Sequence, residues 1–314
     1  MDASAVVLES PRHLSLQRLP LADAEAGCIS VDIAWSAIST GTERLLYDGR
    51  MPSFPGMGYP LVPGYEAVGQ VSSADVASGF RRGEWVFVPG AAGCFGEVRS
   101  LFGAAASRLT VSPKRVVGFA PDLGERGVLL ALAATAHHAL TIGGIGHAEC
   151  IVGHGVLGRL LARLVLSLGG DPPVVWESNS ERAQGAVGYP VVAPQDDDRR
   201  NYRVIVDASG DAGLMDTLIA RLAHGGQIVL AGFYSAPLSF FYPPAFMREA
   251  SIRIAAEWRH DDLIAVRNLV DSGRLSLDGL ITHHAAAASA ETAYRTAFDD
   301  PSCLKMVLDW RAAA

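Results

Sequence analysis

The chain has 314 residues, of which 49% are hydrophobic and 19% are charged. This balance is typical of a folded protein with room for two domains and excludes a single small module. The net charge of -7, without a cluster of lysines and arginines among aromatic residues, argues against nucleic acid as a partner.

The four cysteines are dispersed and form no CxxC pair, which argues against a disulfide framework and a four-cysteine zinc lobe. The segment Met1–Ser10 lacks the basic and apolar regions of a secretion signal. The apolar stretch Val156–Leu168 is short for a membrane span and carries Arg159 and Arg163. We therefore expect a cytoplasmic protein without membrane spans, for which a peripheral membrane contact stays open.

The first 140 or so residues are expected to be rich in β-structure. Short alternating runs, such as Cys28–Trp35 and Gly69–Ser73, are separated by glycine and proline turns. From Cys150 onward, apolar strands are followed by glycine turns and helices, which is typical of a parallel sheet with crossover helices. The strands expected there are Cys150–Val152, Val174–Trp176, Val191–Val192, Val204–Val206 and Gln227–Ala231.

Gly169 and Gly170 should end the first helix of this region, where a residue with positive φ is preferred. An amphipathic helix is expected at Asp261–Ser272, and the chain later reaches the apolar run Met306–Trp310. We predict a β-rich domain over residues 1–140, a parallel-sheet domain over 141–262, and a tail over 263–314 that returns to the first domain.

The segment from Gly153 to Gly158 matches GxGxxG and lies between an apolar strand and a helix. The first glycine permits a tight turn, the second lets the backbone approach a pyrophosphate, and the third lets helix and strand pack closely. The helix N-terminus adds amide donors and a positive dipole end. The residues expected to bind a dinucleotide here are Gly153, His154, Gly155, Val156, Leu157 and Gly158. A loop that merely needs glycines is the alternative.

Glu177 ends the second strand of the parallel sheet, near where the acid that binds the adenosine ribose is expected. A carboxylate there accepts from the 2′-hydroxyl and repels a 2′-phosphate, which predicts NAD rather than NADP. Arg182 could tolerate a phosphate if it turned inward. Asp207 is expected to be a turn residue beside the cofactor, and His154 either contacts the pyrophosphate or is exposed to solvent.

Four segments resemble the medium-chain dehydrogenase/reductase superfamily: Thr40–Glu43, Gly64–Gly69, the glycine turn and Leu280–His283. The resemblance covers essentially the whole chain. It implies an α/β fold in which a GroES-like, β-rich catalytic domain encloses a Rossmann domain with a doubly wound parallel sheet.

In zinc-dependent members of the superfamily, cysteine and histidine bind the catalytic metal at the positions that Thr40 and Tyr65 occupy here. The third ligand region, Leu132–Thr135, offers neither cysteine nor glutamate, and Cys94 stands alone where a structural zinc lobe has four cysteines. A tetrahedral catalytic zinc needs three protein donors. The resemblance therefore implies a dehydrogenase without a metal site.

A closer resemblance, carried by Ser36–Arg44, Pro63–Gly69 and Ala134–Leu140, is to the branch of this superfamily that serves bacteriochlorophyll synthesis. It implies oxidation of the C3 1-hydroxyethyl group of a bacteriochlorophyllide to an acetyl group, with NAD as cofactor and the bacteriochlorin pigment as the small-molecule partner. By analogy with the superfamily, we expect a homodimer.

Oxidation of a secondary alcohol without a metal needs a side chain that accepts the hydroxyl proton or stabilises the resulting anion. Thr42 stands at the hydroxyl-relay position of the superfamily and is expected to pass the proton outward. Tyr65, whose ordinary pKa is about 10, suits donation of a hydrogen bond to the substrate oxygen better than proton abstraction. A core phenol is the alternative for Tyr65.

Two acids and two histidines complete the candidate catalytic set. Glu43 and Glu66 lie near the vacant metal positions, although binding of Arg44 or of buried amides is the more expected role for both. His137 and His138 are neighbours on an expected helix, so that their side chains diverge by about 100° and at most one can face the cleft. For either histidine, a packed or solvated position at the domain junction is the alternative.

A flat macrocycle requires an open apolar cleft. Two segments, within Met51–Pro60 and around residues 233–244, combine aromatic faces with rigid turns and could line it. Their expected contact residues are Phe54, Met57 and Tyr59 in the first segment and Phe233 and Tyr234 in the second. Loop packing or a dimer contact is the alternative.

Two other functions stay open from the sequence. A zinc-free quinone or enone reductase of the same superfamily would use NADPH and reduce an activated double bond, and Glu177 argues against it. A non-catalytic protein that senses NAD(H) would need neither Thr42 nor an aromatic cleft.

Overall fold

The computed structural model describes residues 2–21, 27–53, 55–90, 95–144 and 147–312. The chain forms two compact units: unit 1 consists of Met1–Ala131 and Asp278–Ala314, and unit 2 consists of Leu132–Leu277. The domain boundaries were expected at residues 140 and 262. Unit 2 extends beyond both of them, because it also includes residues 132–140 and 263–277. The three-segment division itself stays a prediction.

Unit 1 is built around two β-sheets. One has the strand order β2-β1-β4-β7, and the other has the order β16-β17-β3-β5-β6-β9, with β8 also paired to β3. The strands are β1 (Asp2–Ser10), β2 (His13–Pro20), β3 (Ile29–Ile38), β4 (Leu61–Val62), β5 (Ala67–Ser73), β6 (Trp85–Val88), β7 (Arg99–Ser100), β8 (Arg108–Val111), β9 (Val117–Gly118), β16 (His283–Ala286) and β17 (Met306–Asp309).

The C-terminal segment completes the larger sheet of unit 1. Most of the expected apolar run Met306–Trp310 forms β17, which ends at Asp309. This strand pairs antiparallel with β3. Its side chains join a core of buried aliphatic residues from β1, β3, β5 and β6, whose burial drives the association. Two helices belong to this unit, α1 (Thr42–Tyr47) and α7 (Ala290–Asp299).

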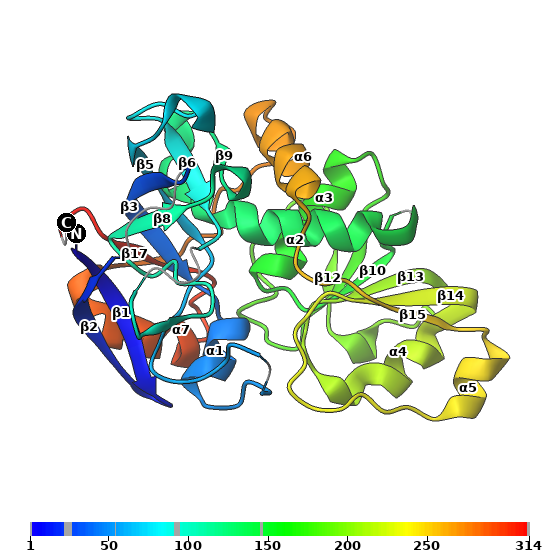
Figure 1. Ribbon diagram of the computed structural model, residues 1–314. Helices are drawn as coiled ribbons and strands as arrows, with labels where there is room; N and C mark the ends of the chain where they lie inside the picture. The colour runs from blue at the N-terminus through cyan, green and yellow to red at the C-terminus, as the bar shows by residue number, and fades with distance from the viewer. Residues whose placement is uncertain (1, 22–26, 54, 91–94, 145–146, 313–314) are drawn as a thin grey trace. The chain divides into compact units, whose positions relative to one another are not determined.

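Unit 2 contains a parallel sheet with the strand order β12-β11-β10-β13-β14-β15. Relative to their order along the chain, the strands run 3-2-1-4-5-6, which is the order of a Rossmann fold. Figure 1 shows α3 and α4 on opposite faces of this sheet. The strands are β10 (Cys150–Val152), β11 (Val174–Trp176), β12 (Val191–Val192), β13 (Tyr202–Asp207), β14 (Leu222–Leu230) and β15 (Ser251–Ile254).

The helices of unit 2 follow from apolar spacing and from glycine punctuation. Helix α3 ends just before Gly169, whose φ of +85° confirms the residue with positive φ expected there. The helices are α2 (Leu130–Thr141), which begins at the end of unit 1, α3 (Val156–Ser167), α4 (Met215–Arg221), α5 (Tyr242–Met247) and α6 (His260–Asp271). Short 3-10 helices are η1 (Val76–Ser78), η2 (Pro113–Arg115), η3 (Pro121–Leu129), η4 (Ile142–Gly144), η5 (Pro194–Asp196), η6 (Ala212–Leu214) and η7 (Ala287–Ser289).

Among the described residues, no helix has both the length and the apolar character needed to span a bilayer.

Candidate functional site

The glycine turn between β10 and α3 has the geometry of an anion-binding turn. Gly153 has a φ of +94°, and a Cβ on Gly158 would lie only 1.8 Å from the Gly153 carbonyl oxygen, so glycine is required at both positions. A Cβ on Gly155 would meet no described atom within 4 Å. No side chain caps α3, and the first amides of a helix have no intrahelical partner. The turn thus combines amide donors with room for a pyrophosphate.

Glu177 is tied directly to this turn. Its Oε2 accepts a hydrogen bond from the His154 backbone amide at 3.0 Å, and its Oε1 accepts from the Asn179 amide at 2.8 Å. Because each carboxylate oxygen has a second lone pair, the side chain can still accept from ribose hydroxyls. The structure therefore orients the carboxylate beside the turn, and its contact with a cofactor stays a prediction.

The side chain of His154 is fully buried, which excludes the solvent-exposed alternative. Its Nδ1 donates to the Arg182 carbonyl at 2.6 Å, so Nε2 accepts from the Tyr189 hydroxyl at 2.9 Å. Burial, assisted by the charge of Arg159, lowers the pKa of His154 and keeps the ring neutral. Both ring nitrogens therefore serve the architecture of the turn.

Asp207, at the end of β13, holds the loop that follows this strand. Its Oδ1 accepts from the amide and hydroxyl of Ser209 at 2.8 and 2.6 Å, and its Oδ2 accepts from the Tyr234 hydroxyl at 2.7 Å. Burial raises the pKa of Asp207, while these donors lower it. A Cβ on Gly153 would lie 3.4 Å from the backbone of Ser209, so this loop packs against the glycine turn.

A separate cluster of hydroxyl groups lies in unit 1 and includes two of the predicted catalytic residues. The Tyr65 hydroxyl is 2.7 Å from the Ser39 Oγ and also hydrogen-bonds to the Thr42 side chain. Tyr65 and Ser39 are buried, whereas Thr42 is only partly buried. Burial, followed by the charge of Glu66, raises the pKa of Tyr65. The phenol therefore stays protonated at neutral pH and is suited to donate.

Glu43 lies behind this cluster, in the first turn of α1. Its Oε1 accepts from the Ser39 amide at 3.0 Å, and its Oε2 accepts from the Tyr294 hydroxyl at 2.8 Å. Burial raises its pKa to about 7, against the lowering effect of these two donors. The expectation that Glu43 binds a buried amide is confirmed. Arg44, the other expected partner, instead lies 3.8 Å from Asp48.

Glu66 forms a buried ion pair that the sequence did not indicate. Its Oε2 lies 2.7 Å from the Lys305 Nζ, and the side chains of Glu66 and Lys305 are 0% and 1% exposed. The Oε1 atom of Glu66 has no hydrogen-bond partner among the described residues. Burial raises the pKa of Glu66, and the Lys305 ammonium opposes the rise. The predicted alternatives for Glu66, Arg44 and backbone amides, are thus replaced by Lys305.

His137 and His138 both contact the same carboxylate. The Nδ1 of His137 donates to Asp262 Oδ1 at 2.7 Å, and the Nδ1 of His138 donates to Asp262 Oδ2 at 3.0 Å. Asp262 also accepts from the Arg259 amide at 2.8 Å and so caps α6. Both rings therefore converge on one carboxylate, although their positions on the helix differ by about 100°. The expectation that at most one of them faces the cleft stays a prediction. A cavity of about 200 Å³ adjoins His138 and Asp262.

The aromatic residues expected to line a pigment cleft have different surroundings. Phe54 lies outside the described residues. Met57 and Tyr59 pack against the core of unit 1, and the Tyr59 hydroxyl donates to the Leu46 carbonyl. Tyr234 is held by Asp207, whereas Phe233 is 49% exposed. Contact of these residues with a pigment stays a prediction.

The amino-acid sequence is 56% identical to 2-desacetyl-2-hydroxyethyl bacteriochlorophyllide A dehydrogenase from Cereibacter sphaeroides over the full length of both chains. It is 55% identical, again over both full lengths, to the protein of the same name from Rhodobacter capsulatus. The chain belongs to this family of bacteriochlorophyllide dehydrogenases. The closer resemblance noted at Ser36–Arg44, Pro63–Gly69 and Ala134–Leu140 is thereby confirmed. No protein-family model matches the chain.

Solved structures confirm the expected fold of this bacteriochlorophyllide dehydrogenase family member. The chain matches 2R,3R-butanediol dehydrogenase from Bacillus subtilis with a TM-score of 0.83 and 18% identity, covering 98% of this chain and 99% of that one. It matches an alcohol dehydrogenase from Thermus sp. ATN1 with a TM-score of 0.84 and 22% identity, covering 99% and 100%. The chain therefore has the fold of these two dehydrogenases.

The side chain at one metal-binding position of the zinc-dependent enzymes has other partners here. Tyr65 is engaged with Ser39 and Thr42, so its phenol belongs to the hydroxyl cluster. In the part of the chain that the structure describes, no group of three histidine, cysteine, aspartate or glutamate side chains could hold a metal ion. Cys94 lies outside the described residues. This donor set does not fit a tetrahedral zinc.

Several residues of the site were missed from the sequence. Tyr294 and Lys305 in unit 1 and Asp262 in unit 2 gain their roles from partners that are more than 100 positions away along the chain. Ser39 was also missed, and its hydroxyl contacts Tyr65, 26 positions away. Lys305 gave the clearest available signal, because it is a cation directly before the apolar run Met306–Trp310. A charged residue at the start of a buried strand requires a buried counter-charge.

Proposed function

We propose that the chain uses NAD to oxidise the C3 1-hydroxyethyl group of a bacteriochlorophyllide to an acetyl group, without catalytic zinc. The observation that carries this proposal is the full-length identity of 56% and 55% to two dehydrogenases whose names specify the hydroxyethyl bacteriochlorophyllide. The fold and the glycine turn of unit 2 supply the dinucleotide site that such a reaction requires.

The cofactor preference rests on Glu177. The carboxylate is held beside the glycine turn by two backbone amides. A 2′-phosphate at the adenosine ribose would bring like charges together, whereas a 2′-hydroxyl can donate to the carboxylate. We therefore infer NAD rather than NADP. When bound, NAD+ would supply the acceptor for the hydride of the carbinol carbon, and the glycine turn with Glu177 would hold it.

The protein must handle the proton that leaves the substrate hydroxyl. Thr42 is the most exposed member of the hydroxyl cluster and hydrogen-bonds to Tyr65. We assign Thr42 to the substrate oxygen and to proton transfer, and Tyr65, which stays protonated, to hydrogen-bond donation. Preorganised donors of this kind stabilise the charge that develops on the oxygen. Glu43 and Glu66 act behind them as positioning residues. Ser39 and Tyr294 bind the two oxygens of Glu43, and Lys305 binds one oxygen of Glu66.

The proposed reaction changes the absorption spectrum of the pigment, because the new carbonyl conjugates with the ring. Incubation of the purified protein with NAD+ and the 3-(1-hydroxyethyl) bacteriochlorophyllide should shift the long-wavelength band and form NADH in equal amount. A protein that binds NADH but converts no pigment would contradict the proposal and indicate a sensor. A stoichiometric zinc whose removal abolishes activity would contradict the zinc-free mechanism.

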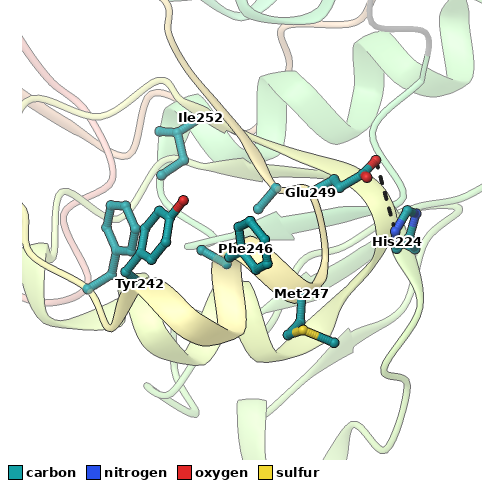
Figure 2. A pocket seen from close by; sticks show the side chains of 9 residues that line it. His224, Tyr242, Phe246, Met247, Glu249 and Ile252 are labelled. Atoms are coloured by element: carbon teal, nitrogen blue, oxygen red, sulfur yellow. Dashed lines mark ion pairs between the residues drawn. The ribbon is translucent and has the colours of Figure 1, made fainter.

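We also propose that the protein is a homodimer that forms through unit 2. Strand β15 lies at the edge of the parallel sheet, and Ile254 on it is 70% exposed. Next to it, a cavity of about 450 Å³ is lined by aromatic and aliphatic side chains, among them Tyr242, Phe246, Met247 and Ile252. Figure 2 shows these side chains around the cavity, with the ion pair between His224 and Glu249 at its side.

An apolar edge strand next to exposed aromatic residues fits a second copy of the chain, because strand pairing would satisfy the edge amides and bury the apolar side chains. Sedimentation should give a dimer for the wild type and a monomer for Ile254→Glu. Val187 is 74% exposed elsewhere in unit 2, so Val187→Glu is the control and should stay dimeric. A monomeric wild type at micromolar concentration would contradict the proposed dimer.

A further inference from the structure

Arg159 is a buried cation in the first turn of the helix that follows the glycine turn. Its side chain is 5% exposed although α3 carries it one turn from Gly155. The Nε donates to the His154 carbonyl at 3.0 Å, and Nη2 donates to the carbonyls of Arg182 and Gln184 at 2.9 and 2.7 Å. All three acceptors are neutral backbone groups.

The charge of Arg159 has no counter-charge at contact distance. The hydrogen bonds of its guanidinium go to backbone carbonyls, and it forms no ion pair with a carboxylate among the described residues. The charge of Glu177 still favours its protonated form, although the contacts of Glu177 itself are with backbone amides. Burial lowers the pKa of Arg159, but a guanidinium stays protonated in proteins. A buried charge is stabilised most by an opposite charge in contact with it, and no carboxylate among the described residues contacts Arg159.

The hydrogen bonds of Arg159 also shape the turn. The guanidinium binds the carbonyl oxygen of His154, which carries a partial negative charge. This contact reduces the repulsion between that oxygen and an anion bound at the amides of the turn. By binding the carbonyls of Arg182 and Gln184, the guanidinium joins the helix to the loop after Glu177. A Cβ on Gly185 would lie 2.9 Å from Arg159 Nη1, so the loop leaves space for the guanidinium through a glycine with a φ of +79°.

We propose that Arg159 is a cofactor-positioning residue whose buried charge is neutralised by the pyrophosphate of the dinucleotide. It acts in two ways. Its hydrogen bond to the His154 carbonyl reduces the repulsion between this oxygen and the phosphates, and its positive charge attracts the phosphates to the turn. Its contacts with the carbonyls of Arg182 and Gln184 have a separate, structural role in the loop after Glu177. This inference rests on the proposed dinucleotide function of unit 2.

Three probes distinguish a pyrophosphate role from a general role in stability: NADH, ADP-ribose and adenosine. We expect Arg159→Met to weaken binding of NADH and ADP-ribose by at least about tenfold, as for the loss of one charge-assisted interaction. Adenosine, which has no phosphate, should bind with unchanged affinity. Isothermal calorimetry measures the first two and competition with NADH fluorescence measures adenosine. Equal weakening for adenosine, or no weakening for ADP-ribose, would overturn the proposal.

Arg163 provides the matched control, because it lies one turn further along α3 and donates to the Ser276 carbonyl at 2.9 Å. Arg163→Met removes the same charge from the same helix and should change NADH affinity less than about threefold, since the charge is farther from the turn and more exposed. An equal loss in the two variants would show that only the net charge of the helix matters, which contradicts the assignment.

A third variant keeps the test valid if Arg159→Met does not fold. Arg159→Gln can still donate to the His154 carbonyl but carries no charge, and it should also lose affinity for ADP-ribose and not for adenosine. Full retention of ADP-ribose affinity in Arg159→Gln would refute the role of the charge. A wild-type protein that binds no NADH would instead contradict the proposed function, so that the two failures are distinguishable.

Discussion

The Tyr294 hydroxyl donates to Glu43 Oε2 at 2.8 Å and thereby joins α7, near the C-terminus, to the short helix that begins with Thr42. Both side chains are buried. Because Glu43 also accepts from the Ser39 amide, one carboxylate fixes the segment that carries the hydroxyl groups next to Tyr65. The position of these hydroxyls therefore depends on the C-terminal segment of the chain.

Glu43 predicts a specific pH dependence of stability. Its pKa is raised by burial from 4.5 to about 7, so between these pH values the folded protein retains a proton that the unfolded chain has lost. The free energy of unfolding should therefore fall as pH rises through this window, by a term on the order of 3 kcal/mol. Glu43→Gln should remove this term. Urea unfolding of both proteins at pH 5 and pH 8 measures the difference, and an identical pH dependence would contradict the prediction.

Tyr294→Phe should extend this window to higher pH. The tyrosine hydroxyl lowers the pKa of Glu43 by donating to its ionised form, so its loss leaves the carboxyl protonated to a higher pH. The free energy of unfolding should stop falling at a higher pH in the variant than in the wild type. Unfolding curves taken at half-unit steps from pH 5 to pH 9 would detect this, and a plateau at the same pH would count against it.

The pair of Glu66 and Lys305 should show strong energetic coupling. Lys305→Met leaves the Glu66 carboxylate buried without its cation, which is expected to cost about 3–5 kcal/mol of stability. Adding Glu66→Gln removes the isolated charge and should restore part of that loss. Chemical unfolding of the two single variants and the double variant gives the coupling energy. Additive losses would mean that the two groups do not stabilise each other.

Tyr65→Phe should reduce catalysis without reducing cofactor affinity. Loss of a donor to the substrate oxygen is expected to lower kcat/KM by about 10²- to 10³-fold, while the Kd for NADH stays unchanged because Tyr65 belongs to unit 1. Ser39→Ala removes only the buried partner of the phenol and should have a smaller effect. Because burial and Glu66 raise the pKa of Tyr65, no loss of activity from its ionisation should occur below pH 10, near its ordinary pKa.

Glu177→Gln should reduce the preference for NAD over NADP. The amide side chain retains one oxygen acceptor but no charge, so repulsion of a 2′-phosphate disappears. We expect the ratio of kcat/KM values for NAD and NADP to fall by at least about tenfold, which corresponds to about 1.4 kcal/mol. Glu181→Gln, four positions further along, is the control and should leave the ratio unchanged. A ratio that is the same in Glu177→Gln and the wild type would reject the assignment.

Asp262→Ala should destabilise unit 2 more than it affects chemistry. The substitution removes the acceptor for His137, His138 and the Arg259 amide together, and three buried or partly buried donors then lack a partner. A loss of about 2–4 kcal/mol of stability is expected. If kcat at saturating substrate falls by more than about tenfold in the remaining folded protein, the histidines have a catalytic role that their shared contact does not show.

Local patterns in the sequence were sufficient for several elements of unit 2, but strand β15 was not among the strands expected there. Apolar runs located β10, β11 and β12 with the bounds that the structure has, and the glycine turn indicated the start of α3. These features depend on neighbouring residues, because a strand, a tight turn and a helix N-terminus each have short-range signatures. The fold class followed from their order along the chain.

The side-chain network of the site could not be predicted in the same way. The contact of Glu66 with Lys305 and that of Glu43 with Tyr294 join residues 239 and 251 positions apart. No periodicity relates residues at such separations. The helical angle between His137 and His138 was also misleading, because flexible side chains on adjacent positions can converge on a carboxylate that lies between them. The position of a residue on a helix restricts the direction of its side chain, but the location of the acceptor, here Asp262, determines which hydrogen bond forms.

The division of unit 1 into two chain segments has a consequence for biosynthesis. A ribosome releases the chain from its N-terminus, so β3 emerges long before β17, its antiparallel neighbour. During that interval unit 2, which is continuous, can fold completely. The sheet of unit 1, by contrast, still exposes one side of β3, and the Glu66 carboxylate lacks Lys305. We therefore expect nascent chains to expose an incomplete first unit to chaperones and proteases until translation of the last residues is finished.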